Sequence, residues 1–199
     1  MTKAAFLDRD GVINIDRAYV HKIEDFDWVP GALEAARALS DAGYLIVVVT
    51  NQSGIGRGYY GEADFARLTD WMKARFAEAG APLAGVYFCP HHPEKANPPY
   101  RTDCLCRKPH PGMLLKAAAD LGIDLSSSIM FGDKPSDMTA GRSAGCFERV
   151  QLGTNGIETP TSSSDATRAF QSLACAVSSP WFQQLKPVSY THLTLPTIA

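Results

Sequence analysis

The stretch Phe6-Leu7-Asp8-Arg9-Asp10-Gly11-Val12 joins the end of an apolar run to two carboxylates and a glycine. The run before it, residues 4–7, is typical of a buried strand. Side chains two apart on a strand point the same way, so a bend at Gly11 would place Asp8 and Asp10 at the carboxyl edge of a sheet, where open α/β sheets bind ligands. Two neighbouring carboxylates repel, so they need a cation or a shared proton between them. By itself the stretch would fit a polar turn equally well; otherwise it predicts a site for a hard metal such as Mg²⁺, or a nucleophile paired with an acid/base group.

Strand and helix patterns alternate along the rest of the chain. Short apolar runs predict strands at residues 3–8, 44–50, 84–88, 129–133 and 147–152. Helices are predicted between Gly31 and Gly43 and over residues 62–79, 111–121, 135–144 and 166–177, with a polar, glycine-rich loop at 50–58. This alternation predicts an α/β fold with one doubly wound parallel sheet.

The composition is that of a globular protein and argues against several classes of partner. Of the 199 residues, 45% are hydrophobic and 20% are charged, and the formal net charge is -2. Without a basic excess we expect no nucleic-acid partner, and without a long apolar run or a secretion-signal pattern we expect no membrane association. Five cysteines, three of them between residues 89 and 106, favour a metal site in a reducing cytoplasm over a disulfide framework. We therefore expect a cytoplasmic, monomeric protein.

Four polar groups follow predicted strands or lie just beyond one. They are Asp8 with Asp10, Thr50 with Asn51, Arg107 with Lys108, and Asp133 with Asp137. The carboxyl ends of parallel strands share one edge of a sheet, so these groups should converge on one crevice. Carboxylates for a divalent cation, a hydroxyl beside backbone N–H groups and a fixed cation together predict a Mg²⁺-dependent phosphate site in which a carboxylate can act as the nucleophile. Taken singly, Asp133 or Asp137 would be better explained as a helix N-cap, and Lys108 as a solvated surface lysine.

A second cluster has the spacing of a metal site. Its pattern is Cys89-x-His91, twelve intervening residues, then Cys104-x-Cys106. Four soft ligands in two tight pairs suit tetrahedral Zn²⁺ and leave no open position, so this zinc would be structural and would hold the loop 89–107 together. Spacing alone does not distinguish His91 from His92 as a ligand. The remaining cysteines, Cys146 and Cys175, are predicted to be small buried hydrophobic residues.

The motifs within residues 3–152 resemble those of the haloacid dehalogenase (HAD) superfamily of phosphatases. The matching pieces, in order, are Asp8-Arg9-Asp10-Gly11, Thr50, Lys108 and Gly132-Asp133-x-x-x-Asp137. The resemblance implies that Asp8 attacks phosphorus and that Asp10 serves as the general acid and then the general base. It also implies that Thr50 and the backbone amide of Asn51 hold phosphoryl oxygens, whose charge Lys108 offsets.

The same resemblance implies a ligand set for the metal. Mg²⁺ would be held by Asp8, by the backbone carbonyl of Asp10 and by Asp133. Asp137 would support Lys108 or the water shell of the metal.

The sequence of the zinc loop resembles one group of HAD phosphatases in particular. Cys-Pro-His-His-Pro at 89–93 and Cys-x-Cys-Arg-Lys-Pro-His-Pro-Gly-Met at 104–113 resemble the D-glycero-D-manno-heptose 1,7-bisphosphate 7-phosphatases. This group lacks a large cap domain, and only residues 14–29 separate the first motif from the first predicted helix here. Its pattern favours His91 as the zinc ligand. The implied reaction removes the 7-phosphate of a small phosphorylated sugar through an aspartyl-phosphate, in the biosynthesis of nucleotide-activated heptose for the lipopolysaccharide core.

Short loops would then bind the substrate. The expected contacts are Asn51, Gln52, Ser53, Arg57 and Arg107. The planar forks of Arg57 and Arg107 suit the second phosphate, although Arg57 fits a solvated loop arginine equally well. The histidinol-phosphate phosphatases share much of the pattern and are the alternative, but a cationic substrate would favour acidic groups in these loops. A zinc-loop binding module without catalysis is a third possibility, against which the loop has few basic or aromatic residues.

Residues 1–186 are therefore predicted to form one HAD-like phosphatase domain with its zinc loop at 89–107. The segment 187–199 has no helical period and resembles translated adapter sequence. We expect this tail to be non-native or disordered and to lie outside the folded domain.

Overall fold

The computed structural model describes residues 2–160 and 163–185, so the predicted tail at 187–199 lies outside the described residues. Its centre is a six-stranded parallel sheet in the order β3-β2-β1-β4-β5-β6. The strands are β1 (Lys3–Leu7), β2 (Tyr44–Asn51), β3 (Leu83–Cys89), β4 (Ile129–Gly132), β5 (Glu148–Leu152) and β6 (Arg168–Phe170). The helices are α1 (Ala32–Asp41), α2 (Ser53–Gly56), α3 (Glu62–Glu78), α4 (Gly112–Leu121), α5 (Pro135–Ala144), α6 (Leu173–Ser178) and α7 (Pro180–Leu185), with 3-10 turns η1 (Ile23–Asp25), η2 (Leu125–Ser127) and η3 (Thr154–Gly156).

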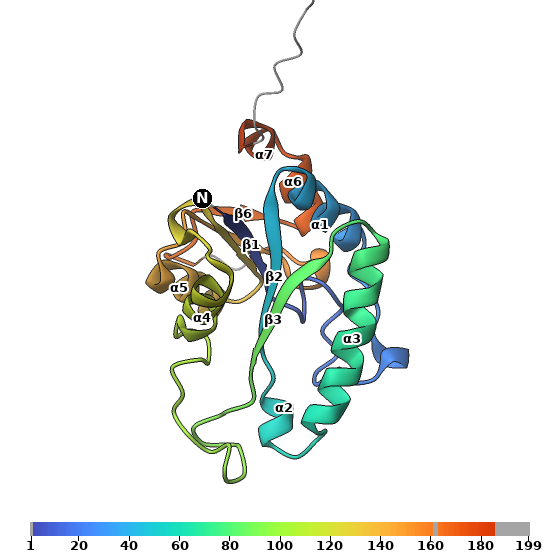
Figure 1. The fold of residues 1–199 in the computed structure, drawn as a ribbon, viewed down its shortest axis with the longest axis vertical. Coiled ribbons are helices and arrows are strands. Elements are labelled where there is room, and N and C mark those ends of the chain that lie inside the picture. Colours follow the sequence, from blue (N-terminus) through green and yellow to red (C-terminus); the bar gives the residue numbers. More distant parts are fainter. Residues whose placement is uncertain (1, 161–162, 186–199) are drawn as a thin grey trace, which may run out of the picture.

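Helices cover both faces of the sheet (Figure 1). Alternate residues of a strand point to opposite faces, and β1 shows this directly. Ala5 and Leu7 join the core on the side of α1, α3 and α6, whereas Ala4 and Phe6 join the core on the side of α4 and α5. Because the central strands are buried on both faces, their sequences read as continuous apolar runs.

The strand order sets the position of the functional edge. The chain moves outward from β1 through β2 to β3 and then returns through α4 to β4, on the other side of β1. The carboxyl ends of β1 and β4 therefore meet at the point where the winding reverses, which is the preferred ligand position in doubly wound sheets. Leu7 pairs with Phe131 in this register, so Asp8 and Asp133 both emerge at that point.

The prediction of a final helix over 166–177 is wrong in its first part. Residues Arg168–Phe170 form the edge strand β6, whose Arg168 pairs with Val150 of β5. The helix α6 starts only after Ser172, whose side chain accepts a hydrogen bond from the backbone N–H of Cys175. A three-residue strand on an edge is too short to show an alternating pattern, and its pairing with β5 outweighs local helical spacing. Cys175 is exposed on α6, contrary to expectation, whereas Cys146 is buried as predicted.

Two further observations concern the loops. The loop predicted at 50–58 contains the short helix α2. Between the first motif and α1, the described residues contain only the 3-10 turn η1 as helical structure, in agreement with a fold that has no large cap domain.

None of the helices in the described part of the chain is long and apolar enough to cross a bilayer.

Candidate active site

A buried cluster of charges lies at the carboxyl ends of β1 and β4. Asp8, Lys108, Asp133 and Asp137 are each at most 5% exposed. The Lys108 ammonium lies 2.9 Å from Oδ1 of Asp8 and 2.6 Å from Oδ1 of Asp137, and it donates a hydrogen bond to the carbonyl of Val49 at 2.9 Å. One lysine thus joins four segments that are far apart in sequence, and the predicted convergence of these motifs is observed. Buried charges are tolerated when they are paired in this way.

Burial also shifts the ionisation of these groups. It raises the pKa of Asp8 to about 7, and the Lys108 ammonium opposes only part of that rise. The pKa of Asp133 is raised to about 6, again mainly by burial. For Lys108 burial acts in the opposite direction, but the carboxylates of Asp137 and Asp8 outweigh it and raise the pKa of the ammonium above its usual range. The site therefore holds more carboxylates than one lysine can compensate.

The donor set suits a hard divalent cation. Carboxylate oxygens of Asp8, Asp133 and Asp137 lie within 4.8 Å of one another. Within the described residues, Oδ1 of Asp133 is buried and accepts no hydrogen bond, and the ammonium of Lys134 is 4.0 Å away. An unsatisfied buried carboxylate oxygen beside two other carboxylates is the environment that Mg²⁺ prefers, so the residues present fit this ion.

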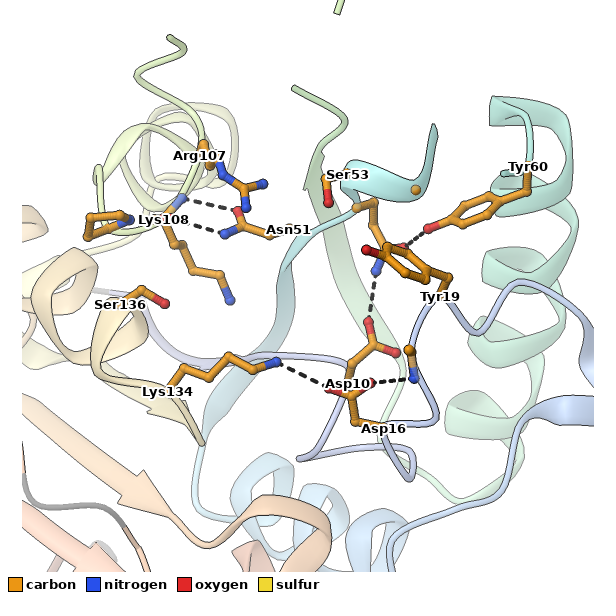
Figure 2. A pocket seen from close by; sticks show the side chains of 14 residues that line it. Asp10, Asp16, Tyr19, Asn51, Ser53, Tyr60, Arg107, Lys108, Lys134 and Ser136 are labelled. Carbon is orange, nitrogen blue, oxygen red and sulfur yellow. Dashed lines mark hydrogen bonds and ion pairs between the residues drawn. The ribbon is translucent and has the colours of Figure 1, made fainter. Parts of the chain in front are cut away.

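Asp10 lies at the same edge in a different environment, held by several hydrogen bonds, of which Figure 2 shows the one from Gln52. It accepts hydrogen bonds from Nη2 of Arg9 at 2.9 and 3.1 Å, from Nδ2 of Asn14 at 3.1 Å and from Nε2 of Gln52 at 3.0 Å. Burial alone would raise the pKa of Asp10, but the Arg9 charge and these hydrogen bonds outweigh it and hold the pKa below its ordinary value. The hydroxyl of Tyr60 donates to Oε1 of Gln52 and so fixes which end of that amide faces Asp10.

The side chain of Asn51 is hydrogen-bonded to the backbone of Lys108. Its Nδ2 donates to the Lys108 carbonyl at 3.0 Å, and its Oδ1 accepts from the Lys108 N–H at 3.1 Å. The Asn51 side chain therefore positions Lys108, while its backbone, whose amide is the group predicted to hold phosphoryl oxygens, lies at the end of β2 beside Thr50. Both residues line a small cavity of about 40 Å³ together with Asp8 and Lys108.

A larger pocket of about 550 Å³ opens beside this cavity. The residues that line it are Asp10, Asp16, Ala18, Tyr19, Asn51, Gln52, Ser53, Gly54, Tyr60, Arg107, Lys108, Pro109, Lys134 and Ser136. Of the predicted substrate contacts, Arg107 and the segment 51–53 therefore line the pocket, and Arg57 does not. Instead, the Arg57 guanidinium lies over the ring of Tyr19, 5.6 Å from its centroid.

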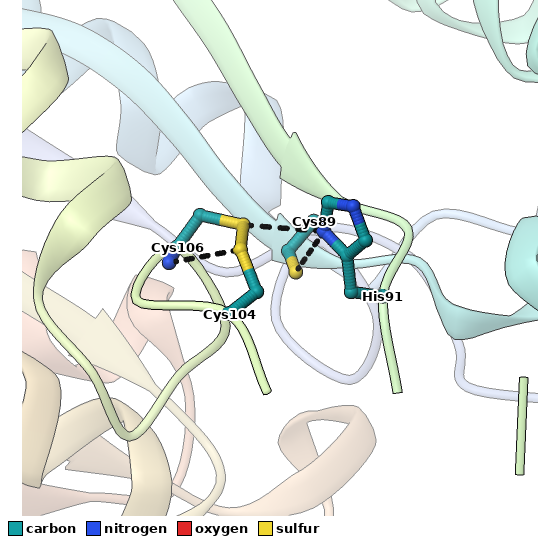
Figure 3. A group of neighbouring side chains, drawn as sticks. All are labelled: Cys89, His91, Cys104 and Cys106. Carbon is teal, nitrogen blue, oxygen red and sulfur yellow. Dashed lines mark hydrogen bonds between the residues drawn. A yellow bond between two sulfur atoms is a disulfide. The ribbon is translucent and has the colours of Figure 1, made fainter. Parts of the chain in front are cut away.

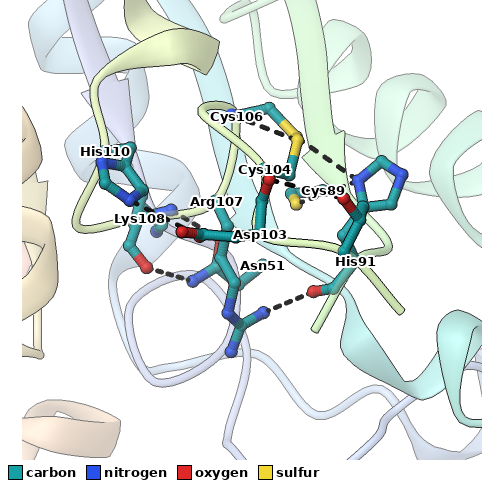
Figure 4. The surroundings of a disulfide bond; sticks show 10 residues. Asn51, Cys89, His91, Asp103, Cys104, Cys106, Arg107, Lys108 and His110 are labelled. Atoms are coloured by element: carbon teal, nitrogen blue, oxygen red, sulfur yellow. Dashed lines mark hydrogen bonds and ion pairs between the residues drawn. A yellow bond between two sulfur atoms is a disulfide. The ribbon is translucent and has the colours of Figure 1, made fainter. Parts of the chain in front are cut away.

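The four predicted zinc ligands lie together in space (Figure 3). Ligand atoms of Cys89, His91, Cys104 and Cys106 are within 4.8 Å of one another, and Nδ1 of His91 is 3.7 Å from Sγ of Cys89 and 3.6 Å from Sγ of Cys106. In the structure Cys104 and Cys106 form a disulfide, although the sequence favoured a metal site over disulfides (Figure 4). Three sulfurs and one nitrogen suit Zn²⁺ when Cys104 and Cys106 are reduced to thiolates, so the donor set fits the ion in that state of the cysteines.

The zinc loop also contacts the active site. Nη1 of Arg107 donates to the carbonyl of His91 at 3.1 Å, and the next residue, Lys108, is the one held by Asn51. In Figure 4 a dashed line joins the Arg107 guanidinium to the backbone carbonyl of His91. The loop therefore fixes a cation at the wall of the pocket.

Comparison with known proteins assigns the chain to a family. Residues 2–145 match the family model described as haloacid dehalogenase-like hydrolase. This chain is a haloacid dehalogenase-like hydrolase. The HAD-like hydrolase is therefore an enzyme, and the alternative of a binding module without catalysis is not supported.

Individual relatives of this HAD-like hydrolase carry more specific names. The D-glycero-beta-D-manno-heptose-1,7-bisphosphate 7-phosphatase of Pasteurella multocida is 48% identical over 87% of this chain and 94% of its own length. The D-glycero-alpha-D-manno-heptose-1,7-bisphosphate 7-phosphatase of Burkholderia mallei is 56% identical over 72% of this chain and 76% of its own length. The crystal structure of D,D-heptose 1,7-bisphosphate phosphatase from B. bronchiseptica, complexed with magnesium and phosphate, is similar with a TM-score of 0.78 and 31% identity, covering 92% of this chain and 99% of that one.

Two site residues of the HAD-like hydrolase were missed in the sequence. Thr154, just after β5, donates to Oδ2 of Asp133 at 2.9 Å. Its neighbour Asn155 accepts from the N–H of Asp16 at 2.7 Å, and the Asn155 N–H donates to the carbonyl of Gly11 at 2.9 Å. The available signal was a polar, glycine-containing stretch at the carboxyl end of a predicted strand, which parallel topology brings to the same edge.

Proposed function

We propose that this HAD-like hydrolase is a Mg²⁺-dependent phosphatase that removes the 7-phosphate of D-glycero-D-manno-heptose 1,7-bisphosphate. The observation that carries the chemistry is the buried contact of Lys108 with Asp8, at the carboxyl end of β1 and beside a second pair of carboxylates. Such a site can place an anionic phosphoryl group between a carboxylate nucleophile and a fixed cation. The named relatives at 48% and 56% identity support the substrate.

In the first half-reaction an oxygen of Asp8 forms a bond to phosphorus while the bond from phosphorus to the sugar oxygen breaks. Asp10 gives its proton to the departing alkoxide. Thr50, the backbone N–H of Asn51 and Lys108 bind the phosphoryl oxygens, so their positive ends face the charge that spreads over those oxygens. The products of this step are the sugar alcohol and an aspartyl-phosphate on Asp8.

In the second half-reaction Asp10 removes a proton from water, and the water oxygen attacks the phosphorus of the aspartyl-phosphate. The bond to Asp8 breaks and inorganic phosphate leaves. Because its pKa is lowered, Asp10 is ionised at neutral pH and can accept that proton. Earlier in the cycle, the anionic phosphoryl group close to Asp10 raises its pKa and favours the protonated form that the first step needs.

Mg²⁺ would be held by the side chains of Asp8 and Asp133 and by the backbone carbonyl of Asp10. When bound, it neutralises charge on the phosphoryl oxygens and orients them for attack. Asp137 forms an ion pair with Lys108, which supports its role in positioning that lysine. Thr154 would orient Asp133 as a ligand.

The charges of the pocket support a bisphosphate over histidinol phosphate. The acidic residues of the lining have cationic neighbours: Asp10 contacts Arg9, and Asp16 is 3.3 Å from the ammonium of Lys134. Among the described residues, Arg107 forms no ion pair with a carboxylate; its guanidinium donates to the carbonyl of His91. An uncompensated arginine at the pocket wall suits a second phosphate and repels an ammonium group.

We also propose how the rest of the chain is organised. Residues 1–186 form the catalytic domain, 187–199 are not part of it, and Zn²⁺ on Cys89, His91, Cys104 and Cys106 stabilises the loop 89–107. Three thiolates on zinc require a reducing compartment, so we place the enzyme in the cytoplasm. We also propose that the enzyme acts as a monomer.

The test is phosphate release in the presence of Mg²⁺. Heptose 1,7-bisphosphate, as each anomer, is compared with histidinol phosphate at equal concentration, with Asp8→Asn as the inactive control. We expect a large preference for the bisphosphate and loss of turnover in Asp8→Asn with the fold and zinc content retained. Preference for histidinol phosphate would overturn the substrate, and appreciable turnover by Asp8→Asn would overturn the nucleophile.

A further inference from the structure

Asn155, in the turn η3 after β5, forms two hydrogen bonds to the chain that follows the first motif. Its backbone N–H donates to the carbonyl of Gly11 at 2.9 Å, and its Oδ1 accepts a hydrogen bond from the backbone N–H of Asp16 at 2.7 Å. Asn155 therefore bridges the two ends of the segment 11–16, although it lies 139 residues beyond Asp16 in the chain. One donor and one acceptor of a single residue thus hold this segment in place.

The backbone conformation of Asn155 agrees with such a role. Its φ is 59° and its ψ is 12°, in the left-handed region that asparagine tolerates better than most residues other than glycine. In a residue other than glycine, this conformation persists where surrounding contacts impose it, and it is found often at functional sites. The two hydrogen bonds to the segment 11–16 are contacts of this kind.

Gly11, which Asn155 holds, lies directly against the carboxylate of Asp133. The φ of Gly11 is 90°, and a Cβ at this position would come within 2.4 Å of Oδ2 of Asp133, so this close approach requires glycine. The residue before Gly11 is Asp10, whose backbone carbonyl we propose as a ligand for Mg²⁺. A hydrogen bond that fixes the Gly11 carbonyl therefore also limits how far the Asp10 carbonyl can move relative to Asp133.

The turn η3 contacts both parts of the proposed ligand set. The hydroxyl of Thr154 donates to Oδ2 of Asp133 at 2.9 Å, while the next residue, Asn155, holds the turn that carries Asp10. Ligands that neighbouring hydrogen bonds hold in place lose less freedom when they bind a metal, so such bonds raise the affinity for the ion.

We infer that Asn155 is a positioning residue for the Mg²⁺ site, and that its hydrogen bonds to the segment 11–16 keep the Asp10 carbonyl within reach of the ion bound by Asp8 and Asp133. This inference rests on the proposed function, which supplies those ligands, and goes beyond it because Asn155 is not one of them. The role of Asn155 is to raise the affinity for Mg²⁺, and it takes no part in the chemical step.

The experiment measures Mg²⁺ binding and catalysis separately. Isothermal titration calorimetry on the zinc-loaded full chain without substrate gives the Kd of Mg²⁺, and phosphate release at increasing Mg²⁺ concentration gives kcat at saturation. Asn155→Gly adopts the positive φ without strain but lacks the acceptor for the Asp16 N–H. We expect its Kd for Mg²⁺ to rise about tenfold, which is typical when a hydrogen bond that orients metal ligands is lost. At saturating Mg²⁺ its kcat should return to about the wild-type value.

Three further variants complete the comparison. Asn155→Asp keeps an acceptor oxygen and should bind Mg²⁺ at least as tightly as the wild type. Asn155→Ala loses the acceptor and also disfavours the positive φ, so its Kd should rise at least as far as that of Asn155→Gly. Gln171→Ala is the matched control: Nε2 of Gln171 donates at 3.3 Å to the carbonyl of Ile157, the residue after η3, and the loss of this bond should leave the Kd unchanged.

The outcomes distinguish this inference from the proposed function. A wild type that neither binds Mg²⁺ nor needs it for phosphate release would overturn the proposed function, and this inference with it. A wild type that binds Mg²⁺, combined with an unchanged Kd in Asn155→Gly, would overturn the inference alone. So would a loss of kcat in Asn155→Gly that saturating Mg²⁺ does not restore, because Asn155 would then act on the fold or the chemical step. An equal rise of the Kd in Gln171→Ala would also overturn it, since any loosening of the turn would then suffice.

Discussion

Asp8 and Asp10 are two residues apart, yet their pKa values move in opposite directions. Burial beside other carboxylates raises the pKa of Asp8, whereas Arg9 and side-chain hydrogen bonds outweigh burial and lower the pKa of Asp10. Two carboxylates of one motif can therefore have different roles because their environments differ. The environment of Asp10 depends on residues from another loop, above all on Gln52.

The first prediction concerns Gln52→Leu. This change removes the hydrogen bonds that Nε2 of Gln52 donates to Asp10 and Thr50, at 3.0 and 2.8 Å. We expect kcat to fall about 10- to 100-fold with little change in KM, because a misplaced acid/base group affects the chemical step. Steady-state kinetics on the preferred phosphate ester measure this.

Two comparison variants sharpen that experiment. Tyr60→Phe keeps the Gln52 amide and should lose less activity than Gln52→Leu. Gln183→Leu changes a glutamine of α7, whose amide donates to the carbonyl of Val177, and should have wild-type kinetics. A wild-type kcat in Gln52→Leu would show that Asp10 is oriented without it.

At the scale of elements, loops at the carboxyl ends of β1, β2, β4 and β5 supply the site, together with the loop between β3 and α4. That last loop contains the zinc loop 89–107, which ends at Arg107, and then Lys108; both of these residues are held by residues at strand ends or just beyond them. Arg107 donates to the carbonyl of His91, and Asn51 binds the backbone of Lys108. A change in the cysteine cluster should therefore alter the positions of Arg107 and Lys108 in the pocket.

The second prediction is that Cys104→Ala loses zinc and weakens substrate binding. Without one of its four ligands the ion is held poorly, and the loop that positions Arg107 becomes looser. We expect KM for the bisphosphate to rise about tenfold, while the zinc content measured by elemental analysis falls well below one per chain. Cys146→Ala, a buried cysteine outside the cluster, should keep its zinc. Full zinc content in Cys104→Ala would mean that the ligand set is wrong.

The third prediction concerns pH and the contact between α5 and the segment before β6. Asp165 accepts hydrogen bonds at 2.7 Å from Thr139 and from Arg142, and these lower its pKa, the Thr139 hydrogen bond being the largest cause. A carboxyl group with a lowered pKa stabilises the fold above its unfolded pKa of about 3.9, and that contribution is lost as the pH falls through the lower folded value. Asp165→Asn should therefore lower the Tm by a few degrees at pH 7, and the difference should shrink below about pH 4.

Thermal unfolding at several pH values tests this. Asp41→Asn, which breaks the exposed ion pair of Arg37 with Asp41 on α1, is the control and should change the Tm little. A Tm difference for Asp165→Asn that stays constant from pH 7 to acid would contradict the assignment of the stabilisation to the ionised carboxylate.

At the scale of the whole molecule, the strand order β3-β2-β1-β4-β5-β6 unites the site. Because β1 and β4 are neighbours although more than 120 residues separate them, Asp8 and Asp133 share one crevice. The two helical layers bury the central strands, so the charged cluster lies at the end of a rigid sheet. Precise positioning of this kind is what phosphoryl transfer requires.

The fourth prediction concerns the extent of the folded domain. Deleting residues 187–199 should leave the Tm and kcat/KM unchanged, because we propose that the catalytic domain ends at residue 186. Thermal unfolding and phosphate release on the shortened chain measure both quantities. A Tm lower by many degrees would show that this segment belongs to the fold.

The sequence by itself determined the sheet class and five of the six strands. It also predicted which residues gather in the two clusters, with the choice of His91 over His92 resting on the family resemblance. Buried strands read as apolar runs, and a carboxylate or cysteine at a strand end stands out against them. Several contacts became apparent only in the tertiary structure. They are the pairing of β6 with β5, the hydrogen bonds of the Asn51 side chain to Lys108, the disulfide of Cys104 with Cys106, and the hydrogen bonds that Thr154 donates to Asp133 and Tyr60 donates to Gln52. The physical reason is that local patterns report burial and spacing, whereas these contacts join residues far apart in the chain or depend on where one side chain points, and only the folded backbone decides that.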